Sequence, residues 1–260
     1  MPFVSSNGVR IYYESEGVGP AVVFQTGAGG DLRIWRYAGY PDGLSGFRRI
    51  LMDQRGRGRS DRPVTIESHR MERDVEDVGA VLDDAGVERC AFWGYSDGIL
   101  VGLALGVAHP SRLVALVGTG GLPFQNVSEL PPTDLSELVK EDVSRGGVRF
   151  VLDQYMTTEN ERFPTAIDEN VRAGDPLMHA LDRAGRRSWR GPLALYDGFQ
   201  APTLIFAGEK EDTERETERS VARMPNATLH RIPGVGHLGV FNRSDLSLPA
   251  ATPFLEKAFE

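Results

Sequence analysis

The segment 94–98, Gly-Tyr-Ser-Asp-Gly, constrains the fold of this chain more than any other stretch. It places Ser96 between two glycines, after the apolar run 90–93 and before the apolar run 99–105. A serine at a sharp strand-to-helix turn takes strained backbone angles, and only residues without a Cβ fit two positions before and after it. The pattern therefore predicts a strand, a tight turn that exposes the Ser96 hydroxyl, and a helix whose N-terminal amides face any anion beside it.

A serine in this setting becomes a nucleophile only with a base and an acid, which stand later in the chain. His237, in a loop after a strand-like segment, is the candidate base. The acid is expected after the strand-like run 202–208, where Glu209, Glu211 and Asp212 stand close together. Glu209 is too close to the end of the strand, so Glu211 and Asp212 are both candidates. Side-chain length and position favour Asp212 over Glu211 by a small margin.

Five blocks of the chain, taken together, resemble the α/β-hydrolase-fold serine hydrolases of the esterase or lactonase kind over nearly the whole length. The blocks are residues 7–14, 22–30, 53–60, 94–98 and 232–238. The resemblance implies an oxyanion hole made by two backbone amides, those of Ala28 and Asp97. It also implies an acid three residues past the glycine that ends the strand, which is Glu211. The chain departs from the pattern at Thr26, where many relatives carry a histidine that braces the loop.

Strand and helix signals alternate along the chain, which favours the α/β class, with a mostly parallel central sheet and helices on both faces. Early strands are expected at 11–15, 21–25 and 49–52, a strand at 113–118, and helices at 70–85 and 248–259. Between the strand at 113–118 and the strand-like run 202–208, charged helical stretches replace the β-like runs, at 134–144, 148–155 and 164–173. We therefore expect an α/β-hydrolase core from residues 1–121 and 201–260, with a helical cap inserted at 122–200.

Composition argues against several other classes of protein. The 260 residues, 40% of them hydrophobic and 25% charged, suit one core with one insertion. The net charge of −8 argues against nucleic acid and membranes as partners, and the arginine-rich segment 55–59 lacks the ending of a phosphate-binding loop. The one cysteine, Cys90, cannot form an internal disulfide and is expected to be buried. No leader or membrane-length apolar run stands out, so a cytoplasmic protein is expected; the oligomeric state is not indicated.

These residues predict a cofactor-independent serine hydrolase that cleaves a small-molecule carboxylic ester or lactone through an acyl-Ser96 intermediate. No set of histidine, cysteine and carboxylate residues has metal-ligand spacing, so no metal is expected. Because His237 works as a neutral base, activity is expected to rise with pH through one ionisation at about pH 6 to 7. Similar triads also cleave thioesters, amides and carbon–carbon bonds next to a ketone, and these alternatives stay open. A further alternative is a binding protein that kept the fold and lost catalysis.

Overall fold

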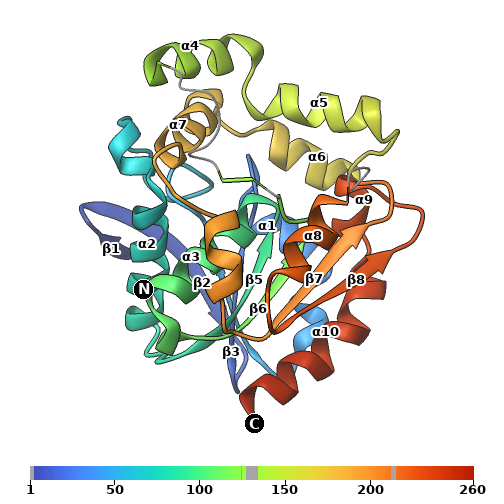
Figure 1. Cartoon of the computed structure of the whole chain (residues 1–260). Coiled ribbons are helices and arrows are strands. Elements are labelled where there is room, and N and C mark those ends of the chain that lie inside the picture. The colour runs from blue at the N-terminus through green and yellow to red at the C-terminus, as the bar shows by residue number, and fades with distance from the viewer. Residues whose placement is uncertain (1–2, 124, 127–133, 212–214) are drawn as a thin grey trace.

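The computed structural model describes residues 3–123, 125–126, 134–211 and 215–260 of the chain. Its centre is an eight-stranded sheet in the order β1-β2-β4-β3-β5-β6-β7-β8 (Figure 1). The strands are β1 (Phe3–Ser6), β2 (Val9–Glu16), β3 (Ala21–Gln25), β4 (Arg48–Met52), β5 (Cys90–Tyr95), β6 (Leu113–Thr119), β7 (Thr203–Gly208) and β8 (Ala227–Ile232). β2 runs antiparallel to both of its neighbours, and the other neighbouring pairs are parallel. The predicted α/β class with a mostly parallel sheet is therefore confirmed.

Helices cover both faces of this sheet. They are α1 (Arg33–Tyr37), α2 (Met71–Asp84), α3 (Asp97–Ala108), α8 (Glu216–Ala222), α9 (His237–Phe241) and α10 (Ser244–Phe259), with short 3-10 turns η1 (Asp42–Leu44), η2 (Ile66–His69), η3 (Pro110–Arg112) and η5 (Leu193–Gly198). Helices α2, α3 and α8 contribute to the apolar cluster on one face, whereas α1, α9 and α10 contribute to the cluster on the other. Side chains of successive strand residues point to opposite faces of the sheet, so each strand contributes to both clusters. Phe92 packs in the first cluster and Trp93 in the second.

Among the described residues, four more α-helices stand between β6 and β7 in the sequence. They are α4 (Leu135–Arg145), α5 (Val148–Thr158), α6 (Thr165–Arg172) and α7 (Pro176–Arg186). In Figure 1 they lie together beyond one end of the sheet, at the top of the view. The sequence predicts α4, α5 and α6 but not α7, which buries the polar side chains of His179, Asp182 and Arg186 beside its apolar residues. The division into a core of 1–121 and 201–260 and a cap of 122–200 stays a prediction.

The Ser96 turn lies where the order of the strands reverses. After β3 the chain adds β4 on one side of it, and then crosses to add β5 on the other side. A crevice is therefore expected at the carboxyl ends of these two adjacent strands. Open α/β sheets bind their ligands at such a crevice, so the fold itself directs attention to Ser96 and to the loop after Gln25.

Candidate active site

Ser96 stands at the turn between β5 and α3, with φ of 53° and ψ of −123°. A non-glycine residue with positive φ is strained and persists only where its surroundings hold it. The flanking glycines allow that close packing: a Cβ on Gly94 would lie 2.4 Å from the carbonyl carbon of Gly98, and a Cβ on Gly98 would lie 2.5 Å from the carbonyl oxygen of Gln25. Neither position has room for a side chain, so the end of β3 and the start of α3 together hold the Ser96 backbone in place.

The loop after β3 runs directly beside Ser96. A Cβ on Gly27 would lie only 2.6 Å from Cβ of Ser96. The Thr26 hydroxyl donates to a carbonyl oxygen at the other end of the loop, at 2.9 Å, and so braces it where many relatives use a histidine. Ala28 follows Gly27 in this loop and is the expected oxyanion donor. The role of its amide, and that of Asp97, stays a prediction.

A continuous chain of side-chain contacts joins Ser96, His237 and Glu211. His237 begins α9, and its Nε2 lies 3.0 Å from Oγ of Ser96. Its Nδ1 contacts Oε1 of Glu211. The second carboxylate oxygen, Oε2, accepts the N–H of Gly208 at 3.0 Å, which anchors the carboxylate to the end of β7. The side chains of His237 and Glu211 are each 9% exposed, so the imidazole is held with one nitrogen toward a carboxylate and the other toward a hydroxyl.

Of the two candidate acids, the structure brings Glu211 to the histidine. A turn after β7 carries it there, with the N–H of Glu211 donating to the carbonyl oxygen of Gly208. Asp212 lies outside the described residues. The geometry therefore favours Glu211, whereas the sequence argument favours Asp212 by a small margin. That argument weighs side-chain length, but the position of the turn relative to Nδ1 decides which carboxylate reaches it.

The environment of His237 changes its ionisation. Burial by itself would lower the pKa of His237, because a charged imidazolium is poorly solvated there. The Glu211 carboxylate, which contacts the ring, and the carboxylates of Glu159 and Asp97 favour the charged form and outweigh burial, so the pKa of His237 is raised above its ordinary value. An activity that requires neutral His237 would therefore set in at a higher pH than the ordinary histidine range suggests.

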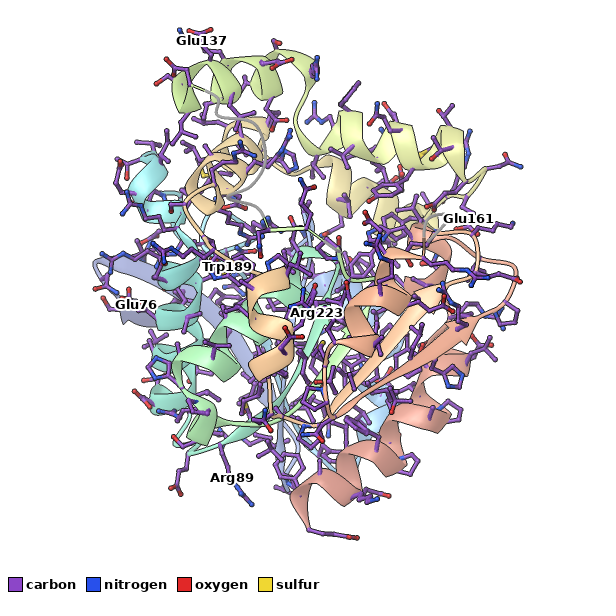
Figure 2. The ribbon with its side chains drawn as sticks, in the orientation of Figure 1. Glu76, Arg89, Glu137, Glu161, Trp189 and Arg223 are labelled. Carbon is purple, nitrogen blue, oxygen red and sulfur yellow. The ribbon has the colours of Figure 1, made fainter. Side chains whose placement is uncertain are left out.

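The segment around the end of α5 contacts the histidine loop from the other side. The ring of Tyr155 stacks on the His237 imidazole, with centroids 4.5 Å apart and planes 13° apart. Oε2 of Glu159 accepts the N–H of His237 at 2.7 Å. Glu161, which lies near α9 in Figure 2, accepts the N–H groups of Gly236 and Gly239 at 2.8 and 2.9 Å. These amides belong to the start of α9, where the helix itself offers them no carbonyl partner.

Sequence reasoning missed Tyr155, Glu159 and Glu161 as site residues. Glu159 is 78 positions from His237 along the chain, and no short motif links the two segments. The sequence offers only the general expectation that helices inserted before β7 can reach the loop that carries His237.

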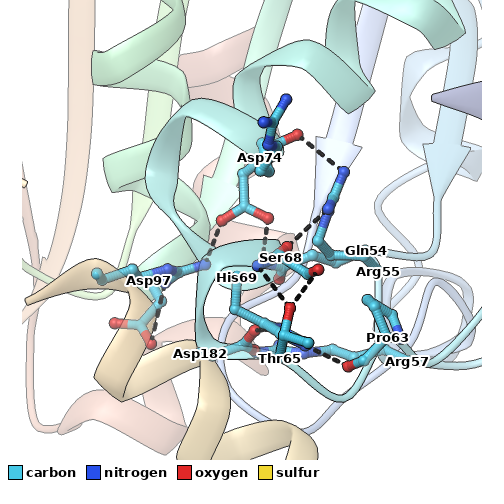
Figure 3. A network of polar contacts seen from close by, with 12 residues as sticks. Gln54, Arg55, Arg57, Pro63, Thr65, Ser68, His69, Asp74, Asp97 and Asp182 are labelled. Carbon is cyan, nitrogen blue, oxygen red and sulfur yellow. Dashed lines mark hydrogen bonds and ion pairs between the residues drawn. The ribbon is translucent and has the colours of Figure 1, made fainter. Parts of the chain in front are cut away.

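A buried polar network joins α7 to loops of the core (Figure 3). Asp182 accepts a hydrogen bond from Arg57 at 2.5 Å and lies 2.5 Å from Nδ1 of His69. Burial would raise the pKa of Asp182, but Arg57 and His69 favour the carboxylate and hold the pKa well below its usual range. Arg57 also donates to the carbonyl oxygen of Gly27. The network therefore connects α7 with the loop beside Ser96.

Arg186 makes a second connection between α7 and the core. Its Nη2 donates to Oδ2 of Asp74 at 2.9 Å, and its Nη1 lies 3.4 Å from Oδ2 of Asp97, the residue after Ser96 (Figure 3). The Arg186 side chain is 7% exposed, while that of Asp97 is 43% exposed. Asp97 thus faces a buried guanidinium on one side and open space on the other.

A cavity of about 280 Å³ opens beside Ser96. His237 and Tyr155 line it, together with the acidic residues Asp97, Glu211 and Glu216. A larger cavity of about 390 Å³ lies on another side of the loop after β3, between the 53–62 segment and helices α6 and α7, and it shares no lining residue with the first. We place the candidate active site in the smaller cavity, because only that one contains the contact between a hydroxyl and a histidine.

Other residues that the sequence analysis names lie inside the protein and do not line the Ser96 cavity. Arg55 pairs with Asp77 and both side chains are 1% exposed; with Arg57 also buried, two of the three arginines of segment 55–59 sit in internal ion pairs. Cys90 is buried as predicted, and burial raises the pKa of its thiol to about 12.

Within the described ranges, no helix has the length and apolar character needed to cross a membrane. In those same ranges, no group of three or more histidine, cysteine and carboxylate side chains could hold a metal ion.

Comparison with known proteins agrees with this architecture. The pattern of the alpha/beta hydrolase fold family matches residues 20–244. A protein of Variovorax paradoxus, provisionally named carbamate hydrolase RutD, is 29% identical over 263 aligned residues, which span 92% of this chain and 96% of the relative. Est816, described as an N-acyl homoserine lactone degrading enzyme, is 27% identical, with a TM-score of 0.76 over 97% of this chain and all of that one. A thermophilic esterase from Thermogutta terrifontis is 20% identical and shares the fold, with a TM-score of 0.83 over 98% of each chain.

A mostly parallel sheet with a serine on a strained strand-to-helix turn, opposite a histidine and a carboxylate, defines the class of α/β proteins with a nucleophile elbow. This chain belongs to the alpha/beta hydrolase fold family. Membership supports a general hydrolase function; the bond cleaved and the mechanism are the subject of the proposal that follows.

Proposed function

We propose that this protein is a cofactor-independent serine hydrolase that cleaves a carboxylic ester or lactone through an acyl-Ser96 intermediate. The observation that carries the proposal is the contact chain from Ser96 Oγ to His237 Nε2, at 3.0 Å, and from His237 Nδ1 to Glu211. A serine hydroxyl is a weak nucleophile at its own pKa, and a base within hydrogen-bond reach is what activates it.

In the first half of the proposed reaction, Oγ of Ser96 forms a bond to the acyl carbon while its proton passes to Nε2 of His237. The carbonyl oxygen becomes an oxyanion, for which the backbone N–H groups of Ala28 and Asp97 are the proposed donors. Glu211 holds the imidazole in the tautomer that has a free lone pair on Nε2, and it stabilises the imidazolium that forms. The tetrahedral species then collapses, and the leaving alcohol takes the proton from His237.

In the second half, a water molecule replaces the alcohol. His237 takes a proton from the water as its oxygen bonds to the acyl carbon, and the bond to Ser96 Oγ breaks as His237 returns the proton to it. The carboxylic acid is released and the enzyme is restored. A lactone follows the same steps, except that the alcohol and the acid leave as one molecule.

The ester or lactone assignment has support from the relatives. Est816 is described as degrading an N-acyl homoserine lactone, over a chain of the same extent as this one. The relative provisionally named carbamate hydrolase would act on a different acyl compound. Thioesters, amides and carbon–carbon bonds next to a ketone fit the same steps and belong in the substrate panel. A catalytically silent binding protein is disfavoured, because an open cavity of about 280 Å³ reaches Ser96 and His237 points at its hydroxyl.

The test uses Ser96→Ala, with Ser144→Ala on the exposed outer helix α4 as a matched control. Turnover of p-nitrophenyl esters of increasing acyl length, of lactones and of thioesters is measured for each variant. Ser96→Ala should lose several orders of magnitude in turnover with little change in melting temperature, and Ser144→Ala should match the wild type. Mass spectrometry should locate a fluorophosphonate adduct on Ser96. An adduct on another serine, or unchanged turnover in Ser96→Ala, contradicts the proposal.

A further inference from the structure

We infer, resting on the proposed function, that the Ser96 cavity takes neutral or positively charged substrates and discriminates against substrates that carry a carboxylate or phosphate close to the cleaved bond. The observation behind this inference is the charge of the groups that face the cavity.

Three carboxylates line the cavity beside Ser96, those of Asp97, Glu211 and Glu216. Among the described residues, its lining contains no lysine and no arginine, and the imidazole of His237 is the one basic group. The side chain of Asp97 is 43% exposed, and Glu216 is exposed at the start of α8. A charged substrate that enters this cavity therefore meets negative groups on more than one side.

The arginine paired with a lining carboxylate, and the basic residues next to lining residues in the sequence, do not line the cavity themselves. Arg186 lies 3.4 Å from Asp97 but is buried and bonds Asp74 at 2.9 Å, so one guanidinium serves two carboxylates. Lys210 and Arg215 are neighbours in sequence of two lining residues, yet neither of them lines the cavity. Arg215 lies 3.6 Å from Glu218, another carboxylate. No positive group of the described chain is thus placed to receive an anionic substituent in this cavity.

The side chains outside the described ranges do not include a cation either. The residues that the structure does not describe are 1–2, 124, 127–133 and 212–214, and their sequence contains no lysine, arginine or histidine. They do include three acidic residues, Glu129, Asp212 and Glu214. None of these side chains therefore carries a positive charge.

The same carboxylates shift the pKa values of two lining groups. Burial raises the pKa of Tyr155, and the charges of Glu211, Asp97 and Glu159 raise it further. The same three carboxylates raise the pKa of His237 against the effect of burial. Both groups respond as they would in a negative field, which opposes a negative charge on the substrate.

The excess of acidic over basic lining residues is found in the Ser96 cavity but not in every cavity of the molecule. The larger cavity of about 390 Å³ is lined by several arginines, among them Arg33, Arg59 and Arg62, in addition to its acidic residues. A negative charge in the Ser96 cavity would also lie close to the oxyanion that forms during attack, so the repulsion grows in the transition state and lowers kcat/KM.

The experiment compares three p-nitrophenyl esters with acyl chains of similar length: pentanoate, the mono-ester of glutarate, and 4-(trimethylammonio)butanoate. Each kcat/KM is divided by the rate of the same ester with hydroxide, which removes differences in intrinsic reactivity. We expect the glutarate ester to be at least about tenfold poorer than the pentanoate ester, and the cationic ester to equal or exceed the neutral one. The difference in corrected kcat/KM between the cationic and the anionic ester should shrink when the salt concentration is raised from 0.05 to about 0.5 M.

The variant Glu216→Gln should narrow the ratio between the cationic and anionic esters by several fold. Glu256→Gln, an exposed residue on α10, removes the same net charge at a distance and should leave the ratio unchanged. Equal corrected kcat/KM values for all three esters, or faster turnover of the glutarate ester, overturn the inference. If Ser96-dependent turnover of the pentanoate ester is present in that case, the proposed function stands. If no ester shows Ser96-dependent turnover, the proposed function fails first, and the charge inference falls with it.

Discussion

Replacing Glu211 by glutamine tests the candidate site most directly. Glutamine keeps the shape of glutamate, and its amide oxygen can still accept the N–H of Gly208, now bonded by Oε2 at 3.0 Å. With that oxygen so used, the amide presents its NH₂ group to Nδ1 of His237. That hydrogen bond stabilises the tautomer with the proton on Nε2, which cannot accept a proton from Ser96.

The magnitude follows from this geometry. A wrong tautomer and the loss of the charge that balances the imidazolium typically reduce turnover by about three to four orders of magnitude, which corresponds to about 4 to 5.5 kcal/mol of activation free energy. The pKa of His237 is raised in part by the Glu211 charge, so it should fall in Glu211→Gln. Because activity requires the neutral imidazole, the acid limb of the residual activity should move to lower pH.

The assay is kcat/KM for a p-nitrophenyl ester across pH, together with the melting temperature, which should change little. Asp212→Asn is the matched control and should lose less than tenfold. The reasoning is refuted if Asp212→Asn loses the larger share of turnover, or if Glu211→Gln stays within tenfold of the wild type with an unmoved pH profile.

Three further substitutions test neighbouring contacts. Glu159→Gln should keep its acceptor for the His237 N–H but remove a charge that raises the histidine pKa, so the acid limb should move to lower pH, by less than in Glu211→Gln; an unmoved limb would contradict this. Gly27→Ala should lower turnover by about 100-fold or more, because its Cβ would lie 2.6 Å from that of Ser96; wild-type turnover would show that the loop can shift. Asp182→Ala should lower the free energy of unfolding by about 3 to 5 kcal/mol, since it leaves buried cationic partners unpaired, and denaturant melts with less than about 1 kcal/mol of change would argue against that role.

Local sequence determined the elements of this protein that depend on short-range sterics and hydrophobic pattern. The spacing of Gly94, Ser96 and Gly98 is enough to predict the strained turn, because a side chain at either glycine would collide with backbone within 2.6 Å. The alternation of apolar runs predicts the mostly parallel sheet, and chain order identifies His237. Helix α10 starts at Ser244, four residues before its predicted beginning, because buried Ser247 and Ala251 pack its early turns on the core despite Pro249.

Tertiary structure decided the features that depend on long-range contacts. Which carboxylate reaches Nδ1 of His237 depends on where the turn after β7 lies relative to α9, and side-chain length could not reveal that. The stacking of Tyr155 on the imidazole and the hydrogen bond that Glu159 accepts from the backbone N–H of His237 join segments about 80 positions apart. Such contacts leave no periodic signal in the sequence, because each residue is chosen for a partner that only folding brings near.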